Sequence, residues 1–128
     1  MITHRCTNYT PAFAETLVAN GAEWLESHRE ALPDVDWVND INLDILDIRH
    51  GHLCIFGQLC ASRAAECGCE HGWDWITSHG LMRQDEGYNL GFAAAYDHQF
   101  PERFGHNIDM LNAAWKKLIT ERRAAVSA

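Results

Sequence analysis

The sequence contains no apolar run long enough to cross a membrane. A spanning helix needs about 20 predominantly apolar residues, and polar or charged residues interrupt every hydrophobic stretch here well before that length. The first residues, MITHRCTNYTPAF, also lack the apolar segment of a secretory signal peptide. We therefore expect no membrane partner and a protein that stays in the cytoplasm.

Basic residues are scarce as well. Ten Lys and Arg stand against 18 Asp and Glu, which gives a formal net charge of −8. Because a negative protein repels the phosphates of DNA and RNA, this balance argues against nucleic-acid binding. The 128 residues fit a single globular domain, 1–128. Five cysteines, an odd number, without an export signal predict reduced thiols rather than a disulfide framework.

Familiar catalytic motifs are missing too. The sequence has no G-x-S-x-G nucleophile elbow, no H-E-x-x-H zinc motif and no glycine-rich phosphate loop. The acidic stretch 34–50 starts with D-x-D, as a calcium loop does, but Val38, Asn39 and Ile45 occupy positions that need an acidic or amide residue, glycine and glutamate. We interpret it as a solvated connection that packs on the core through Trp37, Ile41, Leu43, Ile45, Leu46 and Ile48.

Two long helices are predicted near the ends of the chain. Thr10 can cap the first, Pro11 suits its first position, and Pro33 ends it. Gly21 lies on the apolar stripe of this helix, where we expect another helix to approach closely. The last helix can be capped by Asn107 or Asp109, and its apolar stripe comprises Ile108, Leu111, Trp115, Leu118, Ile119 and Val126.

The stretch LCIFGQLCASRAAECGCEHG, residues 53–72, predicts a central helix at about 53–67. Cys60 and Cys67 are then about 10 Å apart along the helix axis, too far for two thiolates on one zinc ion. Cys54 points to another side of the helix. We therefore interpret Cys54 and Cys60 as small hydrophobic packing residues.

The end of this stretch leaves a metal hypothesis open. Cys67, Cys69 and His71 could converge on a zinc ion after the helix, but a single C-x-C-x-H lacks the second ligand pair of structural zinc sites. A fourth ligand would come from Cys6, His4, His50, His52 or His79. The alternatives are a reduced helix end followed by a loop, which we expect, and redox pairing of the two exposed thiols.

Residues 68–105 are rich in glycine and aromatic residues and predict loops, a short helix from Asp74 to Ser78 that ends at Gly80, and one short strand at 88–92. The fold class expected is therefore mainly all-α, a compact small helical domain. Five tryptophans are many for this length, and tryptophan is enriched at binding hot spots. We expect the interaction residues to include Trp73, Trp75 and Trp37.

Three short motifs resemble a group of small, functionally uncharacterised proteins of actinobacteria and their phages. They are a C-x-x-G-Q-L helix at 54–59, an L-G-F segment at 90–92 and a final helix with an A-W pair at 114–115. The resemblance implies a phage or actinobacterial protein that acts in the bacterial cytoplasm. It implies no catalytic or ligand residue, and residues 67–80 fall outside the shared frame.

The function expected from these observations is that of a small non-enzymatic accessory protein that binds a host protein or a second copy of itself. In a homodimer, the acidic segment 34–47 of one chain could pair with the basic segment 116–123 of the other. No cofactor is expected. The alternatives are a zinc-binding module that uses Cys67, Cys69 and His71, and a small enzyme whose site would be a deep pocket lined by titratable groups.

Overall fold

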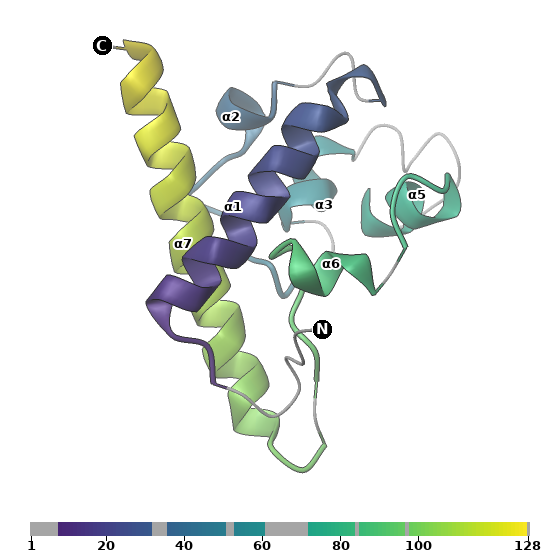
Figure 1. The fold of residues 1–128 in the computed structure, drawn as a ribbon, viewed down its shortest axis with the longest axis vertical. Helices are drawn as coiled ribbons and strands as arrows, with labels where there is room; N and C mark the ends of the chain where they lie inside the picture. The colour runs from purple at the N-terminus through teal and green to yellow at the C-terminus, as the bar shows by residue number, and fades with distance from the viewer. Residues whose placement is uncertain are drawn as a thin grey trace.

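A computed structural model describes residues 8–31, 36–50, 53–60, 72–83, 85–96 and 98–127, with the backbone alone for residues 72, 73, 126 and 127 (Figure 1). Within these ranges the regular elements are all helical, so the all-α prediction is confirmed. The elements are α1 (Pro11–Ser27), a 3-10 helix η1 (Arg29–Ala31), α2 (Trp37–Asp40), α3 (Ile55–Leu59), α5 (Gly72–Ser78), α6 (Glu86–Asn89) and α7 (Pro101–Ser127).

The first and last helices pack against each other and form the frame of the fold, with α1 crossing α7 in front in Figure 1. Helix α1 begins as predicted, because Thr10 is its N-cap and the Thr10 hydroxyl accepts the backbone N–H of Phe13 at 3.1 Å. Of the shorter elements, α2 contacts α7, whereas α6 contacts α1 and lies with α5 on the side of α1 away from α7 in Figure 1; α3 contacts both α2 and α5.

Helix α7 starts six residues before the predicted cap at Asn107. Pro101 stands at its first position, where the missing N–H is no loss. Asn107 is instead an interior residue of α7 with 1% exposure, and its side-chain oxygen accepts the backbone N–H of Tyr9 at 2.7 Å. A side chain that resembled a helix cap therefore fastens the segment before α1 to the last helix.

The predicted central helix is shorter than 53–67. Helix α3 ends at Leu59, with Cys60 as its C-cap, and residues 61–71 lie outside the described ranges. The thiol of Cys54 caps the start of α3 by accepting the N–H of Gly57 at 3.4 Å. Cys54 and Cys60 are buried in the hydrophobic core, at 7% and 0% exposure, so the prediction that they pack in the core is confirmed.

The strand predicted at 88–92 is wrong. Tyr88 belongs to the one-turn helix α6, and the chain then turns through Gly91, whose φ of +73° suits glycine. Alternation of apolar and polar residues over such a short span did not distinguish a strand from a helical turn. The short helix predicted at 74–78 is present as α5, and Gly80 follows it with a φ of +68°.

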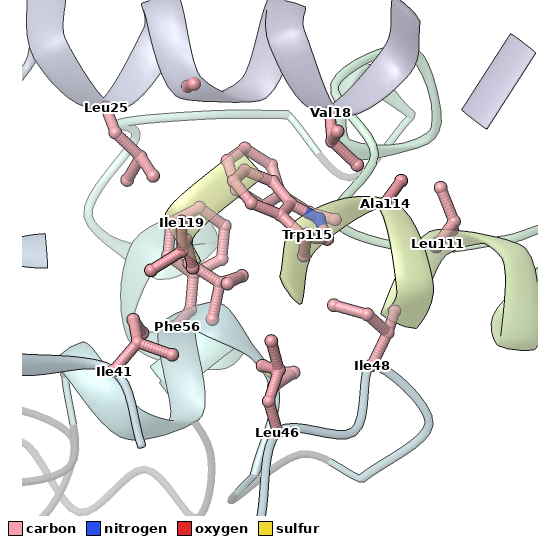
Figure 2. Packing of buried hydrophobic residues seen from close by; sticks show 14 of the residues in the cluster. Val18, Leu25, Ile41, Leu46, Ile48, Phe56, Leu111, Ala114, Trp115 and Ile119 are labelled. Atoms are coloured by element: carbon pink, nitrogen blue, oxygen red, sulfur yellow. The ribbon is translucent and has the colours of Figure 1, made fainter. Parts of the chain in front are cut away.

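The acidic connection packs on the core as predicted, with one exception. Trp37, Ile41, Leu46 and Ile48 are buried and Leu43 is partly buried, whereas Ile45 is 47% exposed. Figure 2 shows Ile41, Leu46 and Ile48 from this connection pointing toward Trp115 and Ile119 of α7, and Phe56 of α3 closing the same cluster.

Close approach at Gly21 is confirmed. A Cβ atom built there would lie 2.1 Å from the carbonyl oxygen of Leu90 and 2.9 Å from the ring of Trp115. The bare backbone of α1 therefore lets both the turn after α6 and the large indole of α7 reach the same spot. A side chain at position 21 would force the Leu90 carbonyl and the Trp115 ring to shift.

Candidate functional site

The three tryptophans predicted as interaction residues have different surroundings. Trp37 is 2% exposed, and its indole Nε1 donates to Glu26 at 2.9 Å. Its ring meets Trp115 edge to face, with 6.5 Å between centroids. Trp37 is thus a core residue of α2 in this structure and offers no free surface to a partner, contrary to the prediction.

Trp75 is half-buried on α5. Its ring stacks on His79 one turn later, with 4.2 Å between centroids, and the Nδ1 of His79 donates to the carbonyl oxygen of Trp75 at 2.8 Å. This pair leaves part of the indole accessible on a short helix. The side chain of Trp73 lies outside the described part of the chain.

The zinc hypothesis rests on residues that the structure does not describe. Cys67, Cys69 and His71 all fall in the range 61–71, and of the suggested fourth ligands only His50 and His79 are described. His50 lies 3.7 Å from a carboxylate oxygen of Asp47. Among the described residues, no group of three His, Cys, Asp or Glu side chains is arranged to hold a metal ion.

An exposed aromatic surface lies just before and within the first turns of α7. We use this name for Tyr96, His98, Phe100, Arg103 and Phe104. Tyr96 is 51% exposed, yet its ring is held edge to face by Phe104 at 5.6 Å and by His98 at 5.0 Å between centroids. Phe104 in turn packs on the core, so an exposed tyrosine is anchored to a rigid support.

Local sequence explains how this surface is built. Pro101 begins α7 and disfavours a helical conformation at Phe100, so the chain changes direction there. The N–H of Arg103 then bonds to the carbonyl oxygen of Phe100 at 3.0 Å, and the guanidinium carbon of Arg103 lies 3.9 Å from the centre of the Phe100 ring. A cation over an aromatic face at this distance is attracted by the ring quadrupole.

Charged residues of both signs surround the aromatic surface: Glu102 is exposed in the first turn of α7, and two arginines lie nearby. Gly105 has no side chain, and the guanidinium of Arg49 lies 3.7 Å from the position that a Cβ atom would take there. On the same turn of α7, the Nε2 of His106 donates to the carbonyl oxygen of Tyr9 at 2.8 Å. Arg49 and Arg103 therefore both lie at this end of α7.

A second feature is a cleft of about 360 Å³ at the end of α1, to which charged residues contribute much of the lining. Its lining includes Glu26, Arg29, Asp36, Val38, Asn39 and Arg122. Arg29 binds the Glu26 carboxylate through two nitrogens, at 2.7 and 2.9 Å, and Arg122 lies 3.8 Å from it. The bonds from Arg29, and then that from Trp37, lower the pKa of Glu26. A carboxylate held ionised in this way stabilises an ion-pair cluster and is poorly suited to deliver a proton.

The acidic segment 34–47 and the basic segment 116–123, which could pair between two chains, contact each other within one chain. The guanidinium of Arg123 donates to the carbonyl oxygens of Val38, at 2.8 Å, and of Ile41. Arg122 lies 5.4 Å from the ring centre of Trp37. Arg122 and Arg123 of α7 are therefore both directed toward the α2 region of their own chain.

The aromatic surface was missed because residues 68–105 were interpreted as loops with aromatic anchors. The signal was present in Phe100-Pro101, since a proline that follows an irregular segment marks a helix start. Because α7 begins at Pro101 and not near Asn107, Phe104 lies in the first turn of this helix, where it supports Tyr96.

Comparisons with known proteins add no assignment. No protein-family model, no curated protein and no solved structure matches the chain. No helix in the described ranges is both long and apolar enough to cross a membrane.

Proposed function

We propose that this chain is a small accessory protein of bacterial or phage origin that acts in the cytoplasm by binding another protein through the aromatic surface. The observation that supports the proposal is Tyr96, which is 51% exposed but fixed by ring contacts on two sides. Hot spots of protein interfaces are enriched in tyrosine, tryptophan and arginine and cluster in well-packed patches.

Rigidity supports this interpretation. An aromatic side chain that is ordered before binding loses less conformational freedom when a partner covers it. Arg103 is likewise held over Phe100 at 3.9 Å, so the surface combines two fixed aromatic groups with a positioned cation. A partner with an apolar side chain beside a carboxylate would match both features.

Photo-crosslinking tests the proposal directly. A photoreactive phenylalanine analogue replaces Tyr96 in the full chain, and in a control chain it replaces Ile45, which has a similar exposure of 47%. After irradiation in bacterial cells, we expect a discrete adduct from position 96 that position 45 does not give. The adduct should weaken at least tenfold when Arg103→Ala is added.

Two results would contradict the proposal. One is the same set of adducts from both positions, because this would indicate random encounters. The other is the absence of any adduct from position 96 when the chain is folded, which far-ultraviolet circular dichroism verifies.

A further inference from the structure

The cleft at the end of α1 lies where several elements of the chain meet. Its polar side chains come from α1, η1, the α2 segment and α7: Glu26, Arg29, Asp36, Asn39 and Arg122. Its volume of about 360 Å³ lies at the lower end of the range for small-molecule sites. The cleft therefore has room for a small metabolite.

The described lining of the cleft is balanced in charge. Two guanidinium groups and two carboxylates contribute to it: Arg29, Arg122, Glu26 and Asp36. Beside the cleft, Asp40 accepts the N–H of Asp36 at 2.9 Å, and Arg123 donates to carbonyl oxygens of α2. A ligand with a single charge meets two lining groups of its own sign, whereas a zwitterion can place each charge beside the opposite one.

Arg122 retains hydrogen-bond donors for a ligand. The carboxylate of Glu26 is already bonded by Arg29 through two nitrogens and by the indole of Trp37. Arg122 lies 3.8 Å from that carboxylate, which is too long for a hydrogen bond. Within the described part of the chain, its guanidinium has no acceptor at hydrogen-bond distance. A guanidinium in this situation can bind a carboxylate through two parallel N–H groups.

Acceptors remain on the α2 side of the cleft. One carboxylate oxygen of Asp36 accepts the side-chain amide of Asn39 at 2.7 Å. No group among the described residues donates to the other carboxylate oxygen of Asp36 or to the side-chain oxygen of Asn39. An ammonium group carries three N–H donors and no acceptor, so these two oxygens suit it.

The remaining lining is apolar and well ordered by its contacts. Val38 is the apolar member and is 8% exposed. The guanidinium carbon of Arg122 lies 5.4 Å from the ring centre of Trp37, and that ring is buried and bonded to Glu26. Because these groups are positioned before a ligand arrives, binding costs less conformational freedom.

We propose that this cleft binds a free α-amino acid with an apolar side chain. Arg122 holds the carboxylate of the ligand, Asp36 and Asn39 hold its ammonium group, and its side chain lies on Val38. No residue of the aromatic surface takes part. The inference therefore goes beyond the proposed protein-binding function and can hold or fail independently of it.

Nuclear magnetic resonance of the nitrogen-15-labelled full chain tests the ligand class. Titration with L-leucine should give saturable shifts of the Trp37 indole N–H and the Asn39 side-chain amide. Isocaproate has the carboxylate of leucine without its ammonium group, and isopentylamine has the ammonium group without the carboxylate. Each should bind at least tenfold more weakly than leucine, because each leaves one pair of charges unmatched.

Three variants test the assigned roles. Arg122→Gln should weaken leucine binding at least tenfold, whereas Arg83→Gln, an exposed arginine that pairs with Glu86 outside the cleft, should leave it unchanged. Asp36→Asn should weaken leucine binding and strengthen isocaproate binding, because it removes a carboxylate that repels the anion. Loss of folding would not produce opposite changes for two ligands, and circular dichroism verifies that each variant is folded.

Three results would overturn the proposal. One is the absence of a saturable shift with millimolar leucine. Another is equal affinity for leucine and isocaproate, which would indicate a simple anion site. The third is wild-type leucine affinity in the Arg122→Gln variant.

Discussion

The indole Nε1 of Trp115 donates a hydrogen bond to the carbonyl oxygen of Gly91 at 2.7 Å, in the interior of the protein. The ring of Trp115 also stacks on Phe92 with 5.4 Å between centroids, and Phe92 contacts Phe56 at 4.4 Å. The A-W, L-G-F and C-x-x-G-Q-L motifs therefore meet in one buried cluster. Their role in this chain is to hold the core together, and the exposed surfaces are built from other residues.

Trp115→Phe should remove the bond to Gly91 and leave its buried carbonyl without that partner. With the small cavity that the smaller ring leaves, we expect a loss of about 2 to 4 kcal/mol in the free energy of unfolding, measured in urea. Trp24→Phe is the matched control, since Trp24 is only half-buried. Equal losses at both positions would show that the bond to Gly91 is unimportant.

Gly21→Ala and Gly105→Ala should change stability in opposite directions. Both glycines lie inside helices, where alanine is favoured by up to about 1 kcal/mol. At Gly21 the new Cβ would lie 2.1 Å from the Leu90 oxygen, so we expect a net loss of about 1 to 3 kcal/mol. At Gly105 the nearest group is Arg49 at 3.7 Å, so the gain should remain. Thermal unfolding of the two variants decides the signs.

Asn107→Ala should loosen the connection between the two ends of the chain. It removes the acceptor for the buried N–H of Tyr9, which predicts a loss of about 1 to 3 kcal/mol. Hydrogen exchange at the Tyr9 amide should accelerate more than exchange in the middle of α1. Asn20→Ala, at an exposed position of α1, serves as the control and should stay within about 0.5 kcal/mol of the wild type.

Tyr9 predicts how stability depends on alkaline pH. Its burial, and secondarily the nearby Tyr88, raises its pKa from 10.0 to about 12. The folded protein then holds this proton more tightly than the unfolded chain, so the stabilisation is present below pH 10 and is lost as the pH rises toward about 12. The unfolding temperature should therefore fall more steeply over this range in the wild type than in Tyr9→Phe. Parallel curves would contradict the prediction.

The sequence predicted features that depend on local chemistry. The cap at Thr10, the close approach at Gly21 and the burial of Cys54 and Cys60 follow from side-chain size, spacing and hydrogen-bonding capacity. Prediction from the sequence failed where contacts between residues far apart in the chain determine where a side chain lies. Asn107 has the side chain of a helix cap, but its partner is Tyr9, 98 residues earlier in the chain. Trp37 is a residue type that is enriched at binding hot spots, but here α7 covers its side chain.

The candidate surface was harder to predict than the core for the same reason. The exposure of Tyr96 depends on the direction in which residues 98–100 enter α7. Neither the residue types nor their periodicity specifies that direction. Arg122 and Arg123 belong to the basic segment that could pair with a second chain, and the fold also brings α2 of the same chain to them.

The packing of α1 on α7 also has a consequence for synthesis on the ribosome. Helix α1 emerges early, but the helix that covers its apolar face is the last described element of the chain. Because α7 is translated after α1, it cannot cover Leu17, Val18 and Leu25 in the nascent polypeptide until α7 itself has been synthesised. Stop codons within α7 should therefore yield products that chaperones retain or proteases remove.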